Sequence, residues 1–425
     1  MVVMNKSDVR LTTMESGLVV LGIARTLVSL NRIQLQATVT PAKLTGSFSE
    51  RIISSLAMST TETQTSTAKM AVQNSSMPRV RQPLGKPSPY IIPAYEGETI
   101  MIPGTKSTVR ILASAKETEG LISVFGMDGA VADPPGFHYH NLAHDVFMCT
   151  KGHLKVWAGQ RCKILGPGDF CYVPPGVVHQ PQLLDDGINE TVGLVTPGQW
   201  VDFFRFVSES YDGVVTDEFD MRNPRDTFGP KMREIKEKYD VVFQHGFQGA
   251  EVGDWTSEDS VLPDEAGKEY YLKANTGPCY LLEGVLSRPF ITTKQSKAPT
   301  GNFAITSIES SNRLVNSVLS KPFVFENTHQ VYHVLDGAIN VSVNGSANLV
   351  RAGETVFVPA GTEMSIEFVD RYVRFWAYSS GDGLEALIAE GGKKFEGKIV
   401  PDKNETLDVE ALKKAAEKFK VKISL

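Results

Sequence analysis

Two stretches decide the fold of this chain: GFHYHNLAHDVFMCTKGHLKVWAG at residues 136–159 and GPGDFCYVPPGVVH at residues 166–179. In both, glycine and proline separate short runs that are rich in β-branched and aromatic residues. Five of the eight histidines of the chain lie here, at positions 138, 140, 144, 153 and 179. Similar runs continue from Tyr90 to about residue 196, which predicts an all-β sandwich or barrel.

Four residues in these stretches have the side chains and the spacing of a metal site. His138 and His140 are two positions apart, so on a strand both would point to one face. Asp145 follows after a short turn, and His179 follows after a predicted hairpin. Imidazole and carboxylate groups suit Fe, Cu, Ni, Mn or Zn, and three histidines leave coordination positions open. We therefore predict that His138, His140, Asp145 and His179 bind one metal ion.

His144 is a weaker ligand candidate, because strand alternation points it away from the face of its neighbour Asp145. Aromatic side chains are numerous enough in this region to line a pocket for a flat substrate. Each of them is also consistent with ordinary barrel core. These aromatic residues are Phe137, Phe147, Trp157, Phe170 and Tyr172.

The second half of the chain repeats the first. Turn residues recur 185 positions later in the pairs Gly152/Gly337, Gly168/Gly353, Pro174/Pro359, Gly176/Gly361 and Gly198/Gly383. The block at 90–104 recurs 180 positions later at 270–284, so the second copy has a five-residue insertion. A repeat of this length indicates two similar domains. The four predicted ligand positions become Phe323, Phe325, Gln330 and Met364, so we expect the second domain to be a structural core without a metal.

The two quoted stretches resemble the two motifs of the cupin superfamily, with Asp145 standing where that family usually has Glu. Within the superfamily, the chain resembles fungal quercetin 2,3-dioxygenases over about residues 88–395. The resemblance implies two double-stranded β-helix (jelly-roll) barrels and one divalent transition metal, Cu or Fe before Ni or Mn. It also implies cleavage of a flavonol heterocycle by O₂ with loss of carbon monoxide. Asp145 would then be the catalytic residue that both touches the metal and takes the hydroxyl proton of the substrate.

Other functions stay open for the same motifs, because one fold hosts many activities. One alternative is a metal-dependent bicupin isomerase or decarboxylase. Another is a bicupin that binds or stores small molecules without catalysis. Uptake of O₂ with a phenolic substrate separates the dioxygenase from both alternatives, and the metal content of the purified protein separates the non-enzymatic one.

Motif positions also predict the domain organisation. We expect a disordered or targeting tail at 1–87, a metal-binding barrel at 88–211, a connector at 212–265, a degenerate barrel at 266–395 and a helical tail at 396–425. Apolar residues at helical spacing predict short helices within 199–211, 231–239 and 408–420.

Composition limits the partners and the compartment. The net charge of −6 and the lack of a basic stripe argue against a nucleic-acid partner. The most apolar run, LVVLGIA at 18–24, is too short for a membrane span and makes a poor signal peptide. We therefore predict a cytoplasmic protein, with secretion as the alternative that the resemblance suggests. Expected partners are a small aromatic substrate and O₂, with a homodimer by resemblance. The four cysteines are expected to be buried, with a Cys149–Cys171 disulfide as the alternative.

Overall fold

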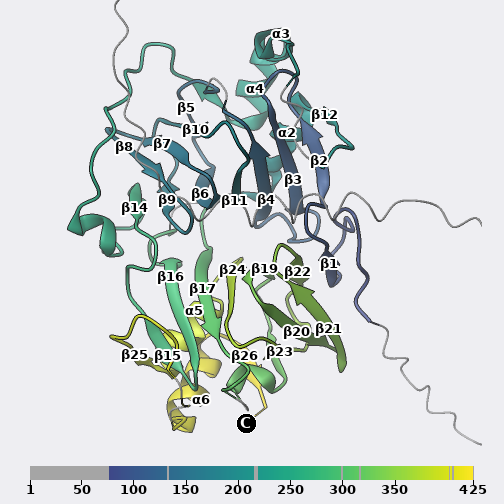
Figure 1. Ribbon diagram of the computed structural model, residues 1–425, viewed down its shortest axis with the longest axis vertical. Coiled ribbons are helices and arrows are strands. Elements are labelled where there is room, and N and C mark those ends of the chain that lie inside the picture. Colours follow the sequence, from purple (N-terminus) through teal and green to yellow (C-terminus); the bar gives the residue numbers. More distant parts are fainter. Residues whose placement is uncertain are drawn as a thin grey trace, which may run out of the picture. The chain divides into compact units, whose positions relative to one another are not determined.

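The computed structural model describes residues 76–131, 134–214, 219–297, 300–314, 317–401, 403 and 406–424. Within these residues the long strands form four antiparallel sheets, two for each half of the chain. Blue and teal ribbons in Figure 1 belong mainly to the first pair of sheets, and green and yellow ribbons mainly to the second pair. This arrangement confirms the prediction of an all-β chain with two jelly-roll barrels.

The first barrel has an apolar core between an eight-stranded and a five-stranded sheet. In spatial order, the eight-stranded sheet contains β12 (Glu209–Ser210), β2 (Glu98–Met101), β3 (Ser107–Ala113), β4 (Ser123–Gly129), β11 (Asn189–Thr196), β6 (His144–Lys151), β9 (Phe170–Val173) and β14 (Tyr270–Leu272). The five-stranded sheet contains β13 (Val242–Phe243), β5 (His138–Tyr139), β10 (His179–Leu183), β7 (Leu154–Ala158) and β8 (Arg161–Leu165).

The second barrel repeats this plan and is filled by a larger apolar core. Its eight-stranded sheet contains β1 (Tyr90–Ile92), β22 (Thr355–Val358), β19 (Gln330–Asp336), β24 (Val373–Ser379), β17 (Ala304–Ser310), β16 (Val285–Ile291), β15 (Tyr280–Leu282) and β25 (Lys393–Lys394). Its five-stranded sheet contains β21 (Ser346–Arg351), β20 (Ala338–Val343), β23 (Met364–Phe368), β18 (Phe323–Phe325) and β26 (Val421–Ile423).

Each half of the chain gives its first strand to the sheet of the other half. Strand β1 pairs with β22, where Tyr90 lies opposite Phe357, and β14 pairs with β9, where Tyr270 lies opposite Tyr172. The exchanged strands carry buried aromatic side chains into a core cluster that both barrels share. The block that repeats with an offset of 180 positions therefore contains the exchanged strands.

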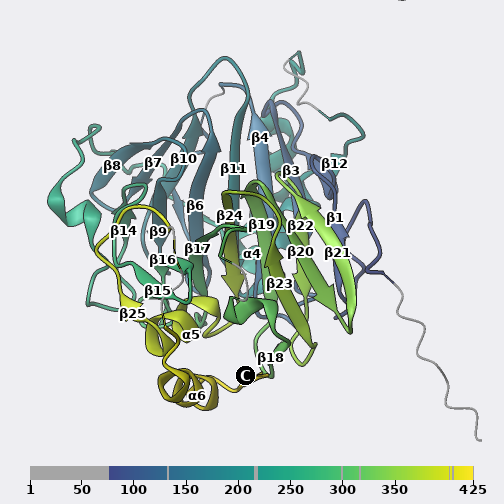
Figure 2. The same cartoon turned by 60° about the horizontal axis from the view of Figure 1, so that its bottom comes forward.

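The five helices of the described ranges are short. They are α2 (Asp202–Val207), α3 (Pro224–Phe228), α4 (Met232–Tyr239), α5 (Leu384–Gly391) and α6 (Val409–Lys418). Helices α2, α4 and α6 confirm the three helices predicted from apolar spacing. The side chain of Asp408 accepts a hydrogen bond from the amide of Ala411 and so caps α6. Leu412 of α6 is fully buried and lies next to Gly391 of α5, and Figure 2 shows the two helices side by side. No helix in the described ranges combines the length and the hydropathy needed to cross a bilayer.

Two expected segment boundaries need correction. Residues 76–87 were assigned to the tail, but Met77 is buried in the second barrel and its amide donates to Asn348 Oδ1 at 2.8 Å. Residues 212–265 were assigned to a connector, but their strand β13 completes the five-stranded sheet of the first barrel. The expected tail at 1–75 lies outside the described residues. All four cysteines are buried and free, which confirms the main expectation and rules out the Cys149–Cys171 disulfide.

Gly168 provides a test of the strand exchange. Its φ of +88° lies in the left-handed region, and an added Cβ would come within 3.1 Å of the Ala274 Cβ, next to the exchanged strand β14. We expect Gly168→Ala to lower the free energy of unfolding by about 1–3 kcal/mol because it combines backbone strain with crowding. Denaturant unfolding would measure the change. Gly187→Ala is the control, because nothing lies within 4 Å of its added Cβ, and equal losses in both variants would contradict the prediction.

Candidate metal centre

The structure brings His138, His140, Asp145 and His179 together inside the first barrel. One ligand atom from each side chain can be chosen so that all four lie within 4.8 Å of one another. His138 lies directly opposite His179 in the pairing of β5 with β10, and their ring centroids are 4.4 Å apart. Asp145 comes from β6 in the other sheet of the same barrel. The site therefore lies between the two sheets, and the spacing of the sequence stretches places these residues as predicted.

Backbone carbonyl groups orient all three imidazole rings. The Nδ1 atoms lie 2.8 Å from Gly136 O for His138, 2.7 Å from Asp240 O for His140 and 2.9 Å from Val177 O for His179. A carbonyl oxygen only accepts hydrogen bonds, so each Nδ1 must carry the hydrogen. The Nε2 atom of each neutral ring is then an unprotonated donor of electrons to a metal.

The carboxylate of Asp145 lies close to two of these rings. Its Oδ2 atom lies 3.2 Å from His140 Nε2 and 2.9 Å from His179 Nε2. Neighbouring ligands that each lie roughly 2.1 Å from an ion are separated by about 3 Å, so these distances suit a shared cation. An ionised carboxylate and an unprotonated Nε2 repel each other unless a proton or a cation lies between them. This group of four side chains fits a single metal site.

The mutual approach of the four groups also shifts their pKa values. Burial and the neighbouring imidazoles of His179 and His140 hold the pKa of His138 well below its usual range. Burial by itself would raise the pKa of Asp145, but without a metal the His140 and His179 rings can carry a proton on Nε2 and donate to its Oδ2, which outweighs burial and lowers that pKa. Despite burial, the same contact with Asp145 raises the pKa of His140. Asp145 is therefore an anion whose charge is available to a cation.

One oxygen of Asp145 has no partner among the described residues. Asp145 Oδ1 is buried and accepts no hydrogen bond, whereas Oδ2 faces the two imidazoles. A buried anionic oxygen without a partner is unfavourable, and either a bound cation or an additional proton donor would relieve it. A hydroxyl group of a bound molecule would be such a donor.

His144 points away from this site, as strand alternation predicts. Its Nδ1 atom lies 2.8 Å from the hydroxyl oxygen of Tyr172, and burial lowers its pKa to about 4. His144 is therefore a neutral residue of the contact between the barrels, where Gly301 of the second half lies close to its ring. Position 329, which is 185 residues later, is also a histidine, and it stacks on Phe357 as His144 stacks on Tyr172.

The aromatic residues of the two motifs divide between two environments. Phe147 lies beside His179 with ring centroids 6.1 Å apart, and Phe137 packs on Trp157 at 5.6 Å. Phe170 and Tyr172 point to the other side of β9, into the core shared by the two barrels. Of the two interpretations given for these five residues, ordinary barrel core is confirmed for Phe170 and Tyr172, because alternate side chains on a strand face opposite ways.

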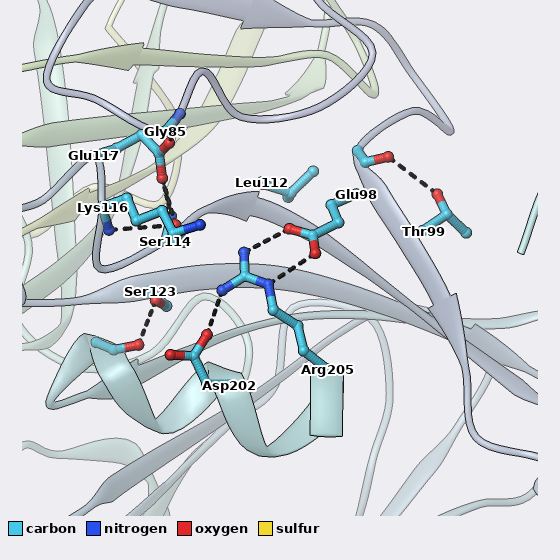
Figure 3. Close-up of polar contacts among 12 residues, drawn as sticks. Gly85, Glu98, Thr99, Leu112, Ser114, Lys116, Glu117, Ser123, Asp202 and Arg205 are labelled. Atoms are coloured by element: carbon cyan, nitrogen blue, oxygen red, sulfur yellow. Dashed lines mark hydrogen bonds and ion pairs between the residues drawn. The ribbon is translucent and has the colours of Figure 1, made fainter. Parts of the chain in front are cut away.

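Trp200 supplies an aromatic wall to the site from a segment for which the sequence predicts only a short helix. Its ring lies 4.9 Å from that of His140, and its side chain is largely buried. Trp200 belongs to the 3₁₀ turn Gly198–Val201, which leads directly into α2. Figure 3 shows how α2 is held: Arg205 donates to both carboxylate oxygens of Glu98 on β2 and to Asp202. These hydrogen bonds of Arg205 hold α2, and with it Trp200, against the site.

The equivalent positions of the second barrel have a different chemistry. Phe323, Phe325 and Met364 are fully buried in its apolar core, and Gln330 accepts a hydrogen bond from Ser379 at 2.8 Å. Glu385 takes the position of Trp200, is fully buried, and leaves its Oε2 without a partner. These side chains fill the space that the imidazoles and Asp145 occupy in the first barrel.

Comparison with known proteins finds a match to the cupin domain. A family model of the cupin domain matches residues 129–190, which contain all four residues of the site. Quercetin 2,3-dioxygenase from Aspergillus japonicus is 23% identical over 338 residues, which cover 74% of this chain and 95% of that protein. This chain is also 32% identical to quercetin 2,3-dioxygenase from Bacillus subtilis (strain 168) over 125 residues, only 36% of that protein and 29% of this chain.

Solved structures that are similar to this chain include a variant of oxalate decarboxylase from Bacillus subtilis, with a TM-score of 0.42 and 15% identity. That match covers 69% of this chain and 77% of the other chain.

Sequence reasoning missed two kinds of residue in this site. Asp240 orients His140 from a position 100 residues away, and nothing in the local sequence distinguishes it from the other charged residues near α4. The carbonyl groups of Gly136 and Val177 were missed because backbone atoms leave no signature in side-chain type. Each of these two carbonyls lies two residues before a predicted ligand histidine, His138 or His179. The positions of those histidines were therefore the signal that could have located the carbonyls.

Removing His179 tests the metal site. We expect His179→Ala to reduce bound transition metal from about one ion per chain to a small fraction, because three of four ligands hold an ion far less tightly. Elemental analysis of the purified variant would measure this loss. The control is His153→Gln, which changes an exposed histidine paired with Asp185 in the same region. Equal metal content in both variants would contradict the assignment.

Glu385 of the second barrel should make stability depend on pH. Burial raises the pKa of Glu385 from 4.5 to about 8, so the folded protein keeps a proton that the unfolded chain loses. The stability of the wild type therefore falls as pH rises from about 4.5 to about 8. We expect Glu385→Gln to gain stability relative to wild type by about 1.4 kcal/mol per pH unit in this window. Urea unfolding at several pH values would measure the gain.

The control for this measurement is Glu410→Gln on the exposed side of α6, which should show no such trend. A constant difference between Glu385→Gln and wild type from pH 5 to 8 would show that the carboxyl is already ionised in the folded state.

Proposed function

We propose that this bicupin is a dioxygenase that opens the heterocycle of a flavonol, or the ring of a related phenolic compound, with O₂. The observation that carries the proposal is the difference in surroundings between the two carboxylate oxygens of Asp145. Oδ2 faces the imidazoles of His140 and His179, while Oδ1 is buried and lacks a donor. An acidic substrate hydroxyl is the group that such an oxygen would receive.

A redox-active transition metal at this site would act as a Lewis acid toward the substrate oxygen and allow electron transfer toward O₂. The residues of the chain would supply the proton acceptor and the contacts that hold the substrate. Asp145 Oδ1 would accept the proton of the enolic hydroxyl, which makes the substrate electron-rich. The rings of Phe147 and Trp200 beside the imidazoles would hold a flat substrate and reduce contact with water.

The relatives support this proposal more than the alternatives. Both curated relatives carry the name quercetin 2,3-dioxygenase, and the Aspergillus protein aligns with most of the chain. A binding or storage bicupin would have no use for a group of four side chains that suits an ion. A decarboxylase or isomerase would use the same ligands without net consumption of O₂, so the assay must measure O₂.

Asp145 provides the decisive test. The metal-loaded protein should consume O₂ and release one molecule of carbon monoxide per flavonol cleaved. We expect Asp145→Asn to lower kcat by roughly 10²- to 10⁴-fold because the amide cannot take the proton. An oxygen electrode and detection of carbon monoxide, with a panel of flavonols and simpler phenols, would measure both quantities.

Two controls make this test specific. Asp145→Glu keeps an acid and should retain more activity than Asp145→Asn, whereas Asp185→Asn changes an exposed carboxylate and should act like wild type. Metal content must be measured for each variant so that loss of the ion is not mistaken for loss of the base. Turnover without O₂ uptake, or full activity in Asp145→Asn, would contradict the proposal.

A further inference from the structure

Asp240 holds one histidine of the site in a different way from the other two. His138 and His179 each find a carbonyl two residues earlier in their own segment, at Gly136 and Val177. His140 instead bonds to the carbonyl of Asp240, at 2.7 Å and 100 residues away in the chain. The direction of this one imidazole therefore depends on how the segment after α4 is folded.

The side chain of Asp240 holds the turn that joins two residues of the site. Its Oδ1 accepts from the amide of the Asn141 side chain at 2.5 Å, and its Oδ2 accepts from the backbone amide of Leu142 at 2.7 Å. This turn lies between His140 and Asp145. The backbone carbonyl of Asp240 thus contacts the ring of His140, and its carboxylate contacts the turn that leads from His140 to Asp145.

Several packed contacts keep Asp240 in place. Its backbone is left-handed, with φ 55° and ψ 37°, and its amide donates to Ile235 O to end α4. Ile235 and Val241 are buried in the cluster that also contains Trp200. Strand β13 follows immediately and pairs with β5, which carries His138. The carbonyl that faces His140 is therefore part of a rigid wall.

The second half of the chain contains a natural comparison. Lys420 lies 180 positions after Asp240, has the same left-handed φ of 56°, and follows α6 as Asp240 follows α4. Strand β26 then pairs with β18, and the carbonyl of Lys420 accepts from the amide of Glu326. Both barrels thus share the helix, the left-handed residue and the closing strand. The carboxylate is present only in the half that has the imidazoles.

We propose that Asp240 is a positioning residue of the metal site: its backbone carbonyl sets the direction of His140, and its carboxylate holds the turn that sets the separation of His140 from Asp145. This inference rests on the proposed metal site and goes beyond it by adding a residue that does not touch the ion. Groups that orient metal ligands from behind typically change metal affinity by 10- to 100-fold when removed.

The test is designed to separate the carboxylate from the backbone. Asp240→Gly removes the carboxylate but tolerates the left-handed conformation, so it adds no backbone strain. Asp240→Asn keeps the side-chain length and one acceptor oxygen. Lys420→Gly makes the matching change in the barrel without the site. Co²⁺ binding to each full-length protein would be followed by its visible absorption spectrum, which reports ligand geometry, and by titration, which reports affinity.

We expect Asp240→Gly to weaken Co²⁺ binding roughly 10- to 100-fold and to alter the visible spectrum. Asp240→Asn should recover part of the affinity, and Lys420→Gly should keep the affinity and the spectrum of wild type. Circular dichroism and the unfolding midpoint would show that each variant is folded. An unchanged affinity and spectrum in Asp240→Gly would overturn the assignment of Asp240 alone, whereas a wild type that binds no Co²⁺ would overturn the metal site itself.

Discussion

Three backbone carbonyls that accept a hydrogen bond from imidazole Nδ1 atoms are the contacts on which the site depends. They fix the position of the hydrogen on each ring and so leave three Nε2 atoms facing one another and Asp145. Such a group of electron-rich atoms is stable only when protons or a cation lie among them. The two sheets of the first barrel provide the rigid frame, since the four side chains come from both of them.

The rest of the first barrel supports this frame from behind. The hydrogen-bonded ion pair between Arg205 and Glu98 anchors α2. The 3₁₀ turn directly before α2 places Trp200 against His140. Helix α4 and strand β13 close the barrel on the side of His138. Segments that look like connections in the sequence are therefore structural parts of the site, and the second barrel shows what the same scaffold does with apolar side chains.

The sequence predicted the elements whose signal is local. The HxH pair, Asp145 and His179 lie within 42 residues of one another, and strand alternation settles which face each occupies, including the outward direction of His144. The duplication was visible because turn glycines and prolines recur at a fixed spacing. Long-range effects were not predictable in this way: the carbonyl of Asp240 carries no side-chain signal, and Trp200 fits a surface helix until its neighbour His140 is known. The pairing partner of an isolated strand such as β1 is likewise invisible in its own residues.

The exchange of first strands between the barrels has a consequence for the relation between the two halves of the chain. Tyr90 lies against the sheet of the second copy and Tyr270 against the sheet of the first, so neither copy completes its own sheet. Two separate polypeptides that traded their amino-terminal strands would make the same contacts. The present chain has the geometry of a strand-swapped dimer within one polypeptide. Each half supplies the strand that the other lacks, whether or not it carries imidazoles of its own.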